Sequence, residues 1–182
     1  MLFFKIRKLR MNITKVMEQT AFTFRMAPES KERMDVVTKV FQENIVPLYG
    51  DQTAALTKIQ EAKDRHCELL FEGETPVGVL VYKKDPNDEC VKFEGREQSL
   101  EIKTLFVIQS QENSGRGLGS QLLQRVVQKA ENVRAKAIHV TVSENKPESL
   151  AFFQKKSFSV IQTVEGLYQE GVKEFVLQRY LA

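Results

Sequence analysis

Three alternating glycines, Gly115, Gly117 and Gly119, carry the clearest chemical signal of this sequence. They follow a β-branched and aromatic run that predicts a strand, and they precede an amphipathic segment that predicts a helix. Without side chains at the helix start, the free backbone N–H groups can approach a ligand closely. Those N–H groups and the positive end of the helix dipole favour an anion. We therefore predict a phosphate or pyrophosphate site at Gly115, Arg116, Gly117, Leu118, Gly119 and Ser120, with the Arg116 guanidinium as its fixed charge.

Two widespread phosphate motifs fit this turn poorly. A P-loop needs a Lys-Ser or Lys-Thr pair after its last glycine, and the turn has none. The Rossmann fingerprint G-x-G-x-x-G meets Ser120 at its third glycine, and it normally follows the first strand of a parallel sheet. A dinucleotide-binding protein therefore remains an alternative that only Gly115 and Gly117 support.

The turn resembles instead the pyrophosphate loop of the GNAT superfamily of acyl-CoA N-acyltransferases. Residues 105–123 are similar to its motif A, Q/R-x-x-G-x-G/A, with Ser114, Gly117 and Gly119 in the key places. Residues 145–158 resemble the motif that follows it, N-x-x-A-x-x-F-Y-x-K-x-G-F, through Asn145, Phe152 and Phe158. The two motifs together cover the central part of a chain whose element order matches the family from about residue 22 to residue 181.

The resemblance implies acetyl-CoA as cosubstrate and assigns further binding residues. The backbone of Phe106 and Val107 would bind the pantetheine arm as an added strand, and an N–H near Val107 would point at the thioester oxygen. The Asn145 amide would bind the same arm, although this residue could equally cap the helix that follows it. Phe152 completes the set of cofactor contacts.

The chain departs from the family pattern at chemically relevant positions. Ser114 replaces the usual Gln or Arg, which weakens or moves one side-chain contact to the phosphates. Phe153 stands in the place of the Tyr that is often proposed to protonate the departing thiolate. Glu148 takes the place of the Ala, and Ser157 replaces the Gly that ends the helix, at a structural cost.

Glu101 is the carboxylate that we predict as general base, because it lies on the central strand. Strict alternation would put it on one face with Lys103, Leu105 and Val107. The alternative is a carboxylate that only forms an ion pair with Lys103. We expect His139 to be a sheet residue and Tyr168 to lie at the surface.

The elements that must position these residues follow from hydrophobic periodicity. We expect a strand at 21–26, a helix from Pro28 that ends near Pro47, and a second helix at 53–63. Further strands are expected at 68–72, 77–82, 100–108, 137–142, 158–164 and 173–180, with helices from 118 and over 147–156. The order β-α-α-β-β-β-α-β-α-β-β predicts an α/β protein of the α+β type, with a mixed, mostly antiparallel sheet flanked by helices.

Composition limits the remaining choices. We expect one domain over residues 21–182 and a loosely ordered basic leader over residues 1–20. The net charge of +3 is too small to indicate nucleic acid, and the apolar runs of the leader are too short for a membrane span. Cys67 and Cys90 lack CxxC spacing and His66 and His139 stand far apart, so we expect reduced thiols, a cytoplasmic location and no metal.

The sequence thus predicts an enzyme, an N-acetyltransferase in which a primary amine attacks acetyl-CoA directly in a ternary complex. The alternative is an acyl-CoA-binding sensor of the same fold with weakened catalysis, which Ser114 and Phe153 favour. The amine acceptor, a small molecule or a protein, is left open, as is a homodimer.

Overall fold

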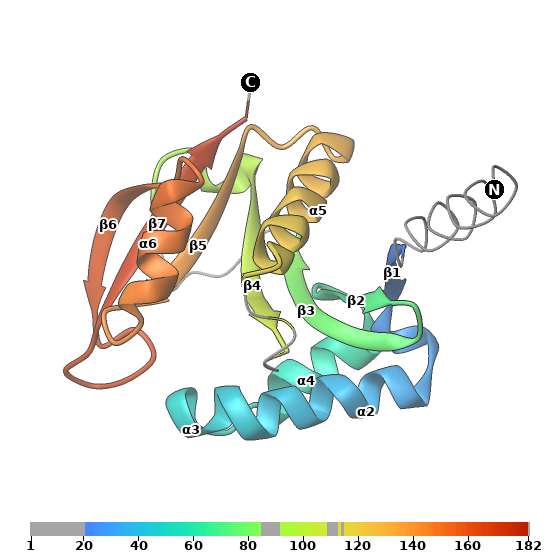
Figure 1. Ribbon diagram of the computed structural model, residues 1–182. Coiled ribbons are helices and arrows are strands. Elements are labelled where there is room, and N and C mark those ends of the chain that lie inside the picture. Colours follow the sequence, from blue (N-terminus) through green and yellow to red (C-terminus); the bar gives the residue numbers. More distant parts are fainter. Residues whose placement is uncertain (1–20, 85–91, 109–112, 114, 182) are drawn as a thin grey trace, which may run out of the picture.

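A computed structural model describes residues 21–84, 92–108, 113 and 115–181. The leader at residues 1–20 and Ser114 lie outside this part of the chain. Seven strands form one sheet in the order β1-β2-β3-β4-β5-β7-β6 (Figure 1). The strands are β1 (Phe22–Met26), β2 (His66–Glu72), β3 (Thr75–Lys83), β4 (Ser99–Val107), β5 (Ala137–Ser143), β6 (Ser159–Glu165) and β7 (Lys173–Tyr180).

The strand pairing confirms the predicted mixed sheet. β1 to β4 pair antiparallel in chain order, and β5, β7 and β6 form a second antiparallel group. The two groups meet at β4 and β5, which run parallel because helix α5 connects them. The element order is the one that the hydrophobic pattern predicts.

Helices cover the two faces of the sheet differently. α5 (Leu118–Asn132) and α6 (Pro147–Lys155) pack on one face, which we call the α5 face. The opposite face, the α2 face, carries α2 (Lys31–Val40), the π-helical turn η2 (Phe41–Ile45), α3 (Val46–Tyr49) and α4 (Thr53–Glu61), as Figure 1 shows. Short 3-10 turns, η1 (Ala27–Glu29) and η3 (Arg96–Gln98), complete the described elements.

Two apolar clusters follow from this layering. On the α5 face, Leu118, Leu122 and Val126 pack against inward residues of the central strands. On the α2 face, Val37, Phe41 and other apolar residues of α2 to α4 cover β2 and β3. The second cluster ends near β4. The part of the α2 face formed by β5 and β7 therefore lies outside this apolar cluster.

The prediction that the first helix ends near Pro47 is wrong by two residues. The π-helical turn at Phe41–Ile45 interrupts the regular hydrogen bonding, and α3 then begins at Val46. Pro47 therefore stands in the first turn of a helix, where its missing N–H costs nothing. The chain finally leaves the helix at Gly50, whose φ is +71° and whose N–H bonds to the Val46 carbonyl at 2.9 Å.

A β-bulge in β4 overturns the predicted alternation around Glu101. Ile102 pairs with Tyr82 and Thr104 pairs with Val81, so Lys103 is an extra residue without its own partner on β3. The bulge reverses the side-chain alternation beyond it. Glu101 consequently lies on the α2 face, whereas Leu105 and Val107 lie on the α5 face and pack against its core.

The two central strands separate soon after they meet. Parallel pairing of β4 with β5 runs only from Ser99↔Ala137 to Ile102↔Val140. Beyond that point residues 104–107 still pair with β3, and residues 141–143 still pair with β7. The facing edges of β4 and β5 are therefore unpaired over these residues, and a splay opens between the two strands.

Candidate functional site

The glycine turn leaves bare amides at the start of α5. Gly115 and Gly117 have φ of +73° and +74°, a conformation that favours glycine, and Gly117 is the N-cap of the helix. The Gly117 carbonyl accepts the N–H groups of Ser120 at 3.0 Å and Gln121 at 3.1 Å. The N–H groups of Leu118 and Gly119 come before this first bond, so they are the donors available to an anion.

This geometry separates the predicted turn residues into two kinds. The Leu118 side chain is buried in the α5 core, so only its backbone can serve a ligand. The Ser120 N–H is used within the helix, which leaves its half-buried side chain for contact. A Cβ atom built on Gly115 or Gly117 would meet no protein atom within 4 Å, so the space before them is open.

The role of Gly119 is to allow close packing, and its backbone does not adopt the left-handed conformation that favours glycine. A Cβ atom there would lie 3.3 Å from Cε2 of Phe152 on α6 and 3.9 Å from Cγ2 of Val107 on β4. The missing side chain thus lets α5, α6 and β4 meet at one point. Phe152 and Val107, which the resemblance assigned to the cofactor from distant parts of the chain, are brought together here.

Arg116 has protein partners in this structure. Its Nη1 donates to Glu72 Oε2 at 2.9 Å and to Asn113 Oδ1 at 3.3 Å, and its Nη2 also bonds to Glu72. Asn113 in turn donates to the Ile108 carbonyl at 2.8 Å. Arg116, which the sequence analysis assigns to the phosphates, is therefore held against β2 by Glu72. This contact fixes the glycine turn to the sheet.

The splayed edge of β4 presents backbone groups next to the turn. Ile108 donates its N–H to the Val77 carbonyl on the β3 side at 3.0 Å. Because N–H directions alternate along a strand, the N–H of Phe106 also faces β3, while those of Leu105 and Val107 face the splay. Val107 thus offers the backbone donor that the resemblance implies. Phe106 points its N–H away from the splay, and its side chain packs against the apolar cluster of the α2 face.

Asn145 is exposed at the start of α6, and it does not cap this helix. The N-cap residue is Lys146, which makes no side-chain capping bond. The Asn145 backbone N–H donates to Ser143 Oγ at 3.3 Å, and its amide makes no hydrogen bond within the described residues. The capping alternative is therefore wrong.

Phe153 belongs to the core. Its ring is buried and meets the Phe158 ring edge-to-face, with centroids 5.2 Å apart. Ser157, in the place of the family's glycine, has a φ of +66°, and the Phe158 N–H bonds to the Phe153 carbonyl at 3.1 Å. This is a Schellman ending that a non-glycine residue occupies with some strain.

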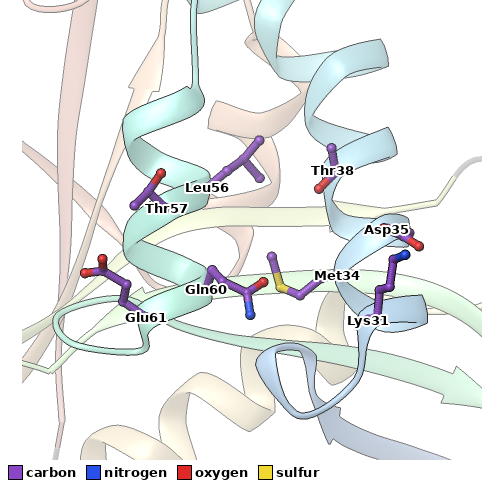
Figure 2. Close-up of a pocket in the computed structure, with 8 residues that line it drawn as sticks. All are labelled: Lys31, Met34, Asp35, Thr38, Leu56, Thr57, Gln60 and Glu61. Atoms are coloured by element: carbon purple, nitrogen blue, oxygen red, sulfur yellow. The ribbon is translucent and has the colours of Figure 1, made fainter.

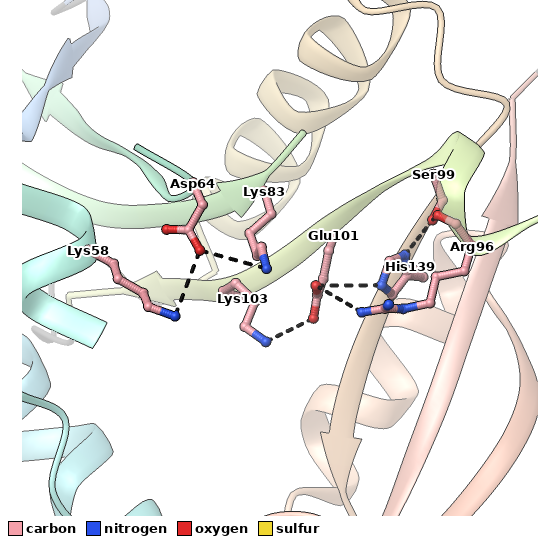
Figure 3. Close-up of polar contacts among 8 residues, drawn as sticks. All are labelled: Lys58, Asp64, Lys83, Arg96, Ser99, Glu101, Lys103 and His139. Atoms are coloured by element: carbon pink, nitrogen blue, oxygen red, sulfur yellow. Dashed lines mark hydrogen bonds and ion pairs between the residues drawn. The ribbon is translucent and has the colours of Figure 1, made fainter. Parts of the chain in front are cut away.

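Glu101 lies among cations on the α2 face, as Figure 3 shows. Its carboxylate, 5% exposed, accepts a hydrogen bond from Lys103 Nζ at 2.8 Å and lies 3.9 Å from Arg96 Nη2. The predicted ion pair with Lys103 is therefore present. Its Oε2 has no hydrogen-bond partner within the described residues.

His139 is a buried sheet residue, as predicted. The Ser99 hydroxyl donates to the Arg96 carbonyl at 2.6 Å, so the 2.7 Å contact between Ser99 Oγ and His139 Nδ1 must be an N–H donated by the histidine. Its Nε2 then lies unprotonated 3.8 Å from Glu101. Burial lowers the pKa of His139 to about 4, so the ring is neutral near pH 7.

The sequence analysis missed a second acidic residue of the α2 face, Glu174 on β7. It is 1% exposed, and burial together with nearby Glu144 raises its pKa to about 7. Tyr49 at the end of α3 interacts with it, and the Tyr49 ring meets that of Tyr168 edge-to-face at 5.9 Å. Alternation in β7 could have indicated Glu174, because it shares a face with buried Val176 and Gln178.

A groove on the outer side of the helices lies apart from these residues. Figure 2 shows it between α2 and α4, and it is lined by Lys31, Met34, Asp35, Thr38, Leu56, Thr57, Gln60 and Glu61. It includes no residue of the glycine turn or of β4. Within the described part of the chain, no group of three or more His, Cys, Asp or Glu side chains could hold a metal, and no helix could cross a membrane.

Comparison with known proteins identifies the family. The Acetyltransferase (GNAT) family profile matches residues 34–158, more than half of the chain. The protein therefore belongs to the GNAT acetyltransferase family. No curated protein sequence matches it significantly.

Solved structures agree with this fold. Arabidopsis thaliana NAA60, solved in complex with acetyl-CoA, is 12% identical with a TM-score of 0.70, covering 88% of this chain and 99% of its own. An N-acetyltransferase from Staphylococcus aureus is 16% identical with a TM-score of 0.66, covering 89% and 99%. An acetyltransferase from Thermus thermophilus is 23% identical with a TM-score of 0.59, covering 87% and 97%.

Proposed function

We propose that this protein is an N-acetyltransferase that moves the acetyl group of acetyl-CoA to a primary amine by direct attack. One observation carries the proposal: the bare start of α5 adjoins the splayed edge of β4. A diphosphate bound by the Leu118 and Gly119 amides would direct the pantetheine arm into the splay, beside Val107.

Each end of the cofactor would then meet groups suited to it. Gly115 and Gly117 leave room for the phosphates, and Arg116 is near enough to exchange its Glu72 contact for one of them. The Val107 N–H would donate to the thioester oxygen as negative charge develops there. A donor of this kind typically contributes about 3 kcal/mol to the transition state.

The amine would approach from the α2 face, opposite to α5. Holding both reactants in a ternary complex can lower the barrier by several kcal/mol. The amine arrives as an ammonium ion at neutral pH, so a base must first remove a proton. Two carboxylates on this face qualify for that role, Glu101 and Glu174.

A sensor that binds acetyl-CoA without turnover is the second candidate, and Phe153 is the observation that favours it. The buried ring supplies no acid for the thiolate. A thiolate is nevertheless a good leaving group, since thiol pKa values are roughly 8.5. We therefore prefer the enzyme.

Binding can be tested with a matched pair of variants, Gly117→Val and Gly95→Val. Both glycines are N-caps with similar backbone angles, φ 77° and ψ 11° at Gly95 and φ 74° and ψ 15° at Gly117, and neither has a protein atom near its Cβ position. Both substitutions should destabilise the fold equally through backbone strain. Only Gly117→Val should abolish the thermal stabilisation by CoA.

The native protein should be stabilised by CoA and unaffected by NAD. A native protein whose melting temperature CoA leaves unchanged would contradict the binding site itself. Turnover is tested by thiol release from acetyl-CoA with small amines, amino acids and peptides. CoA binding without thiol release from any of them would favour the sensor.

A further inference from the structure

Glu174 is a buried carboxylate without a cation. Its side chain is 1% exposed, its Oε1 is buried with no hydrogen-bond partner, and within the described residues no Lys, Arg or His forms an ion pair with it. The Ser143 side chain is its hydrogen-bond donor. Such a group is costly to keep charged unless a cation arrives from outside.

The sheet register places Glu174 beside the splay and on its acceptor side. Glu174 pairs with Ser143, the last residue of β5, where β4 has already separated from β5. Ser143 lies four residues beyond His139, which pairs with Glu101, so all four side chains project from the α2 face. Glu174 is thus one strand away from the gap through which an amine would meet the thioester.

The groups around Glu174 favour proton exchange rather than a fixed charge. The acidic residue Glu144 directly follows β5, and the residue that pairs with Glu174 on β6 is uncharged Val164. From the helices, Tyr49 faces it. This environment raises the pKa of Glu174 to about 7, close to the value that suits a base at neutral pH.

Glu101 lacks this freedom. One of its oxygens accepts the Lys103 ammonium at 2.8 Å, and Arg96 and His139 lie within 4 Å of the other. A substrate ammonium near Glu101 would compete with cations already present. A substrate ammonium near Glu174 would meet no such competitor among the described residues.

Two tyrosines lie near this carboxylate on the α2 face, Tyr49 and Tyr168. Their rings contact each other over the α2 face, and Tyr168, on the β6–β7 connection, is 46% exposed.

We propose that Glu174 binds the ammonium group of the acceptor and takes a proton from it in the transfer described above. This inference rests on the proposed function. Glu174 accepts one proton, which frees the nitrogen lone pair to form the C–N bond at the thioester carbon. The C–S bond breaks as the tetrahedral intermediate collapses, the thiolate takes the second proton from nitrogen, and Glu174 releases its proton to water.

The experiment compares Glu174→Gln with Glu170→Gln, a matched change of an exposed carboxylate on the same hairpin. Steady-state rates are measured from pH 5.5 to 9 with the best acceptor found for the native protein. We expect Glu174→Gln to lower kcat by about 100-fold or more and to remove the loss of activity below pH 7. Glu170→Gln should match the native profile, and Glu174→Asp should regain part of the rate.

CoA binding separates a chemical role from a structural one. Glu174→Gln should keep the CoA dissociation constant within twofold, because Glu174 lies on the acceptor side. A Glu174→Gln variant that keeps kcat within threefold and retains the acidic limb overturns this inference alone. If Glu174→Gln does not fold, the pH profile of Glu174→Asp decides, since a shifted acidic limb supports the inference and an unchanged one overturns it. Absence of turnover by the native protein would instead overturn the proposed function.

Discussion

The two faces of the sheet hold buried carboxylates in opposite conditions. On the α5 face, Glu68 is 1% exposed and receives Arg125 Nε at 2.7 Å, Lys129 Nζ at 2.9 Å and the Tyr82 hydroxyl at 2.9 Å. On the α2 face, Glu174 is equally buried, and the Ser143 side chain is its only side-chain donor among the described residues. The same residue type is thus fully satisfied on one face and incompletely satisfied on the other.

This difference distinguishes a structural charge from a functional one. Burial by itself would raise the pKa of Glu68, but hydrogen bonds from Lys129, Arg125 and Tyr82 outweigh it and lower that pKa. Glu68 therefore stays charged and fastens α5 to β2, which steadies the helix whose start bears the bare amides. Glu174 has no cationic donor in the described part of the chain, and a substrate can supply that partner.

The largest effect should come from the satisfied carboxylate. We expect Glu68→Gln to lower the free energy of unfolding by about 3 kcal/mol, because it leaves Arg125 and Lys129 without their buried counter-charge. Urea denaturation would measure the loss. Glu74→Gln, which breaks an exposed pair with Arg25 on β1, should leave the free energy of unfolding nearly unchanged. Equal losses in the two variants would break the comparison.

The incompletely satisfied carboxylate, Glu174, should make the stability of the protein fall as the pH rises. The pKa of Glu174 rises from 4.5 to about 7 on folding, so between these values the folded state binds more protons than the unfolded state. Its stabilising contribution is complete below pH 4.5 and is lost as the pH rises through about 7.

Relative to Glu174→Gln, the native protein should lose about 2 kcal/mol of stability between about pH 4.5 and 8. The difference between the two proteins cancels the effect of His139, whose lowered pKa destabilises both as the pH falls below 6.5. A constant difference in stability across this range would contradict the assignment.

A smaller effect should come from a satisfied pair within the α2 face. Ser99→Ala removes the acceptor of the His139 Nδ1–H, and we expect a loss of about 1 kcal/mol in urea denaturation. Ser159→Ala, at an exposed position on β6, is the control. No loss in Ser99→Ala would mean that polar contacts on this face are weaker than those around Glu68.

The smallest effect should come from the half-exposed pair beside the glycine turn. Glu72→Gln removes the carboxylate that pairs with Arg116, and the free energy of unfolding should change by less than about 1 kcal/mol. CoA should bind a few-fold more tightly, with a steeper dependence on salt, because the Glu72 carboxylate no longer competes for the guanidinium. Calorimetry at two salt concentrations checks this, and unchanged affinity would leave Arg116 only the role of fixing the turn.

The fold and the turn could be predicted because their signals are local. Alternation gives the strands, periodicity gives α5, and three glycines mark the helix start whatever surrounds them. The predicted cofactor residues Gly119, Phe152 and Val107 do meet, since the family topology brings the start of α5 and the end of β4 against α6.

What escaped prediction depends on contacts between distant segments or on single-residue irregularities. The bulge at Lys103 reverses alternation in β4, and nothing in the local sequence marks it. Arg116 meets Glu72 across 44 residues, and Glu174 pairs with Ser143 on β5 and interacts with Tyr49 of α3. Contacts between residues so far apart in the sequence are set by tertiary packing. The hydrophobic periodicity of the sequence carries no information about them.

The short parallel contact of β4 with β5 also has a consequence for solvent exchange. The amide hydrogens of Leu105 and Val107 face the splay, so in the ligand-free protein they should exchange with deuterium faster than those of Phe106 and Ile108, which bond across to β3. Bound CoA would slow the first pair and leave the second unchanged. These neighbouring amides would then record cofactor occupancy directly, without an acceptor and without turnover.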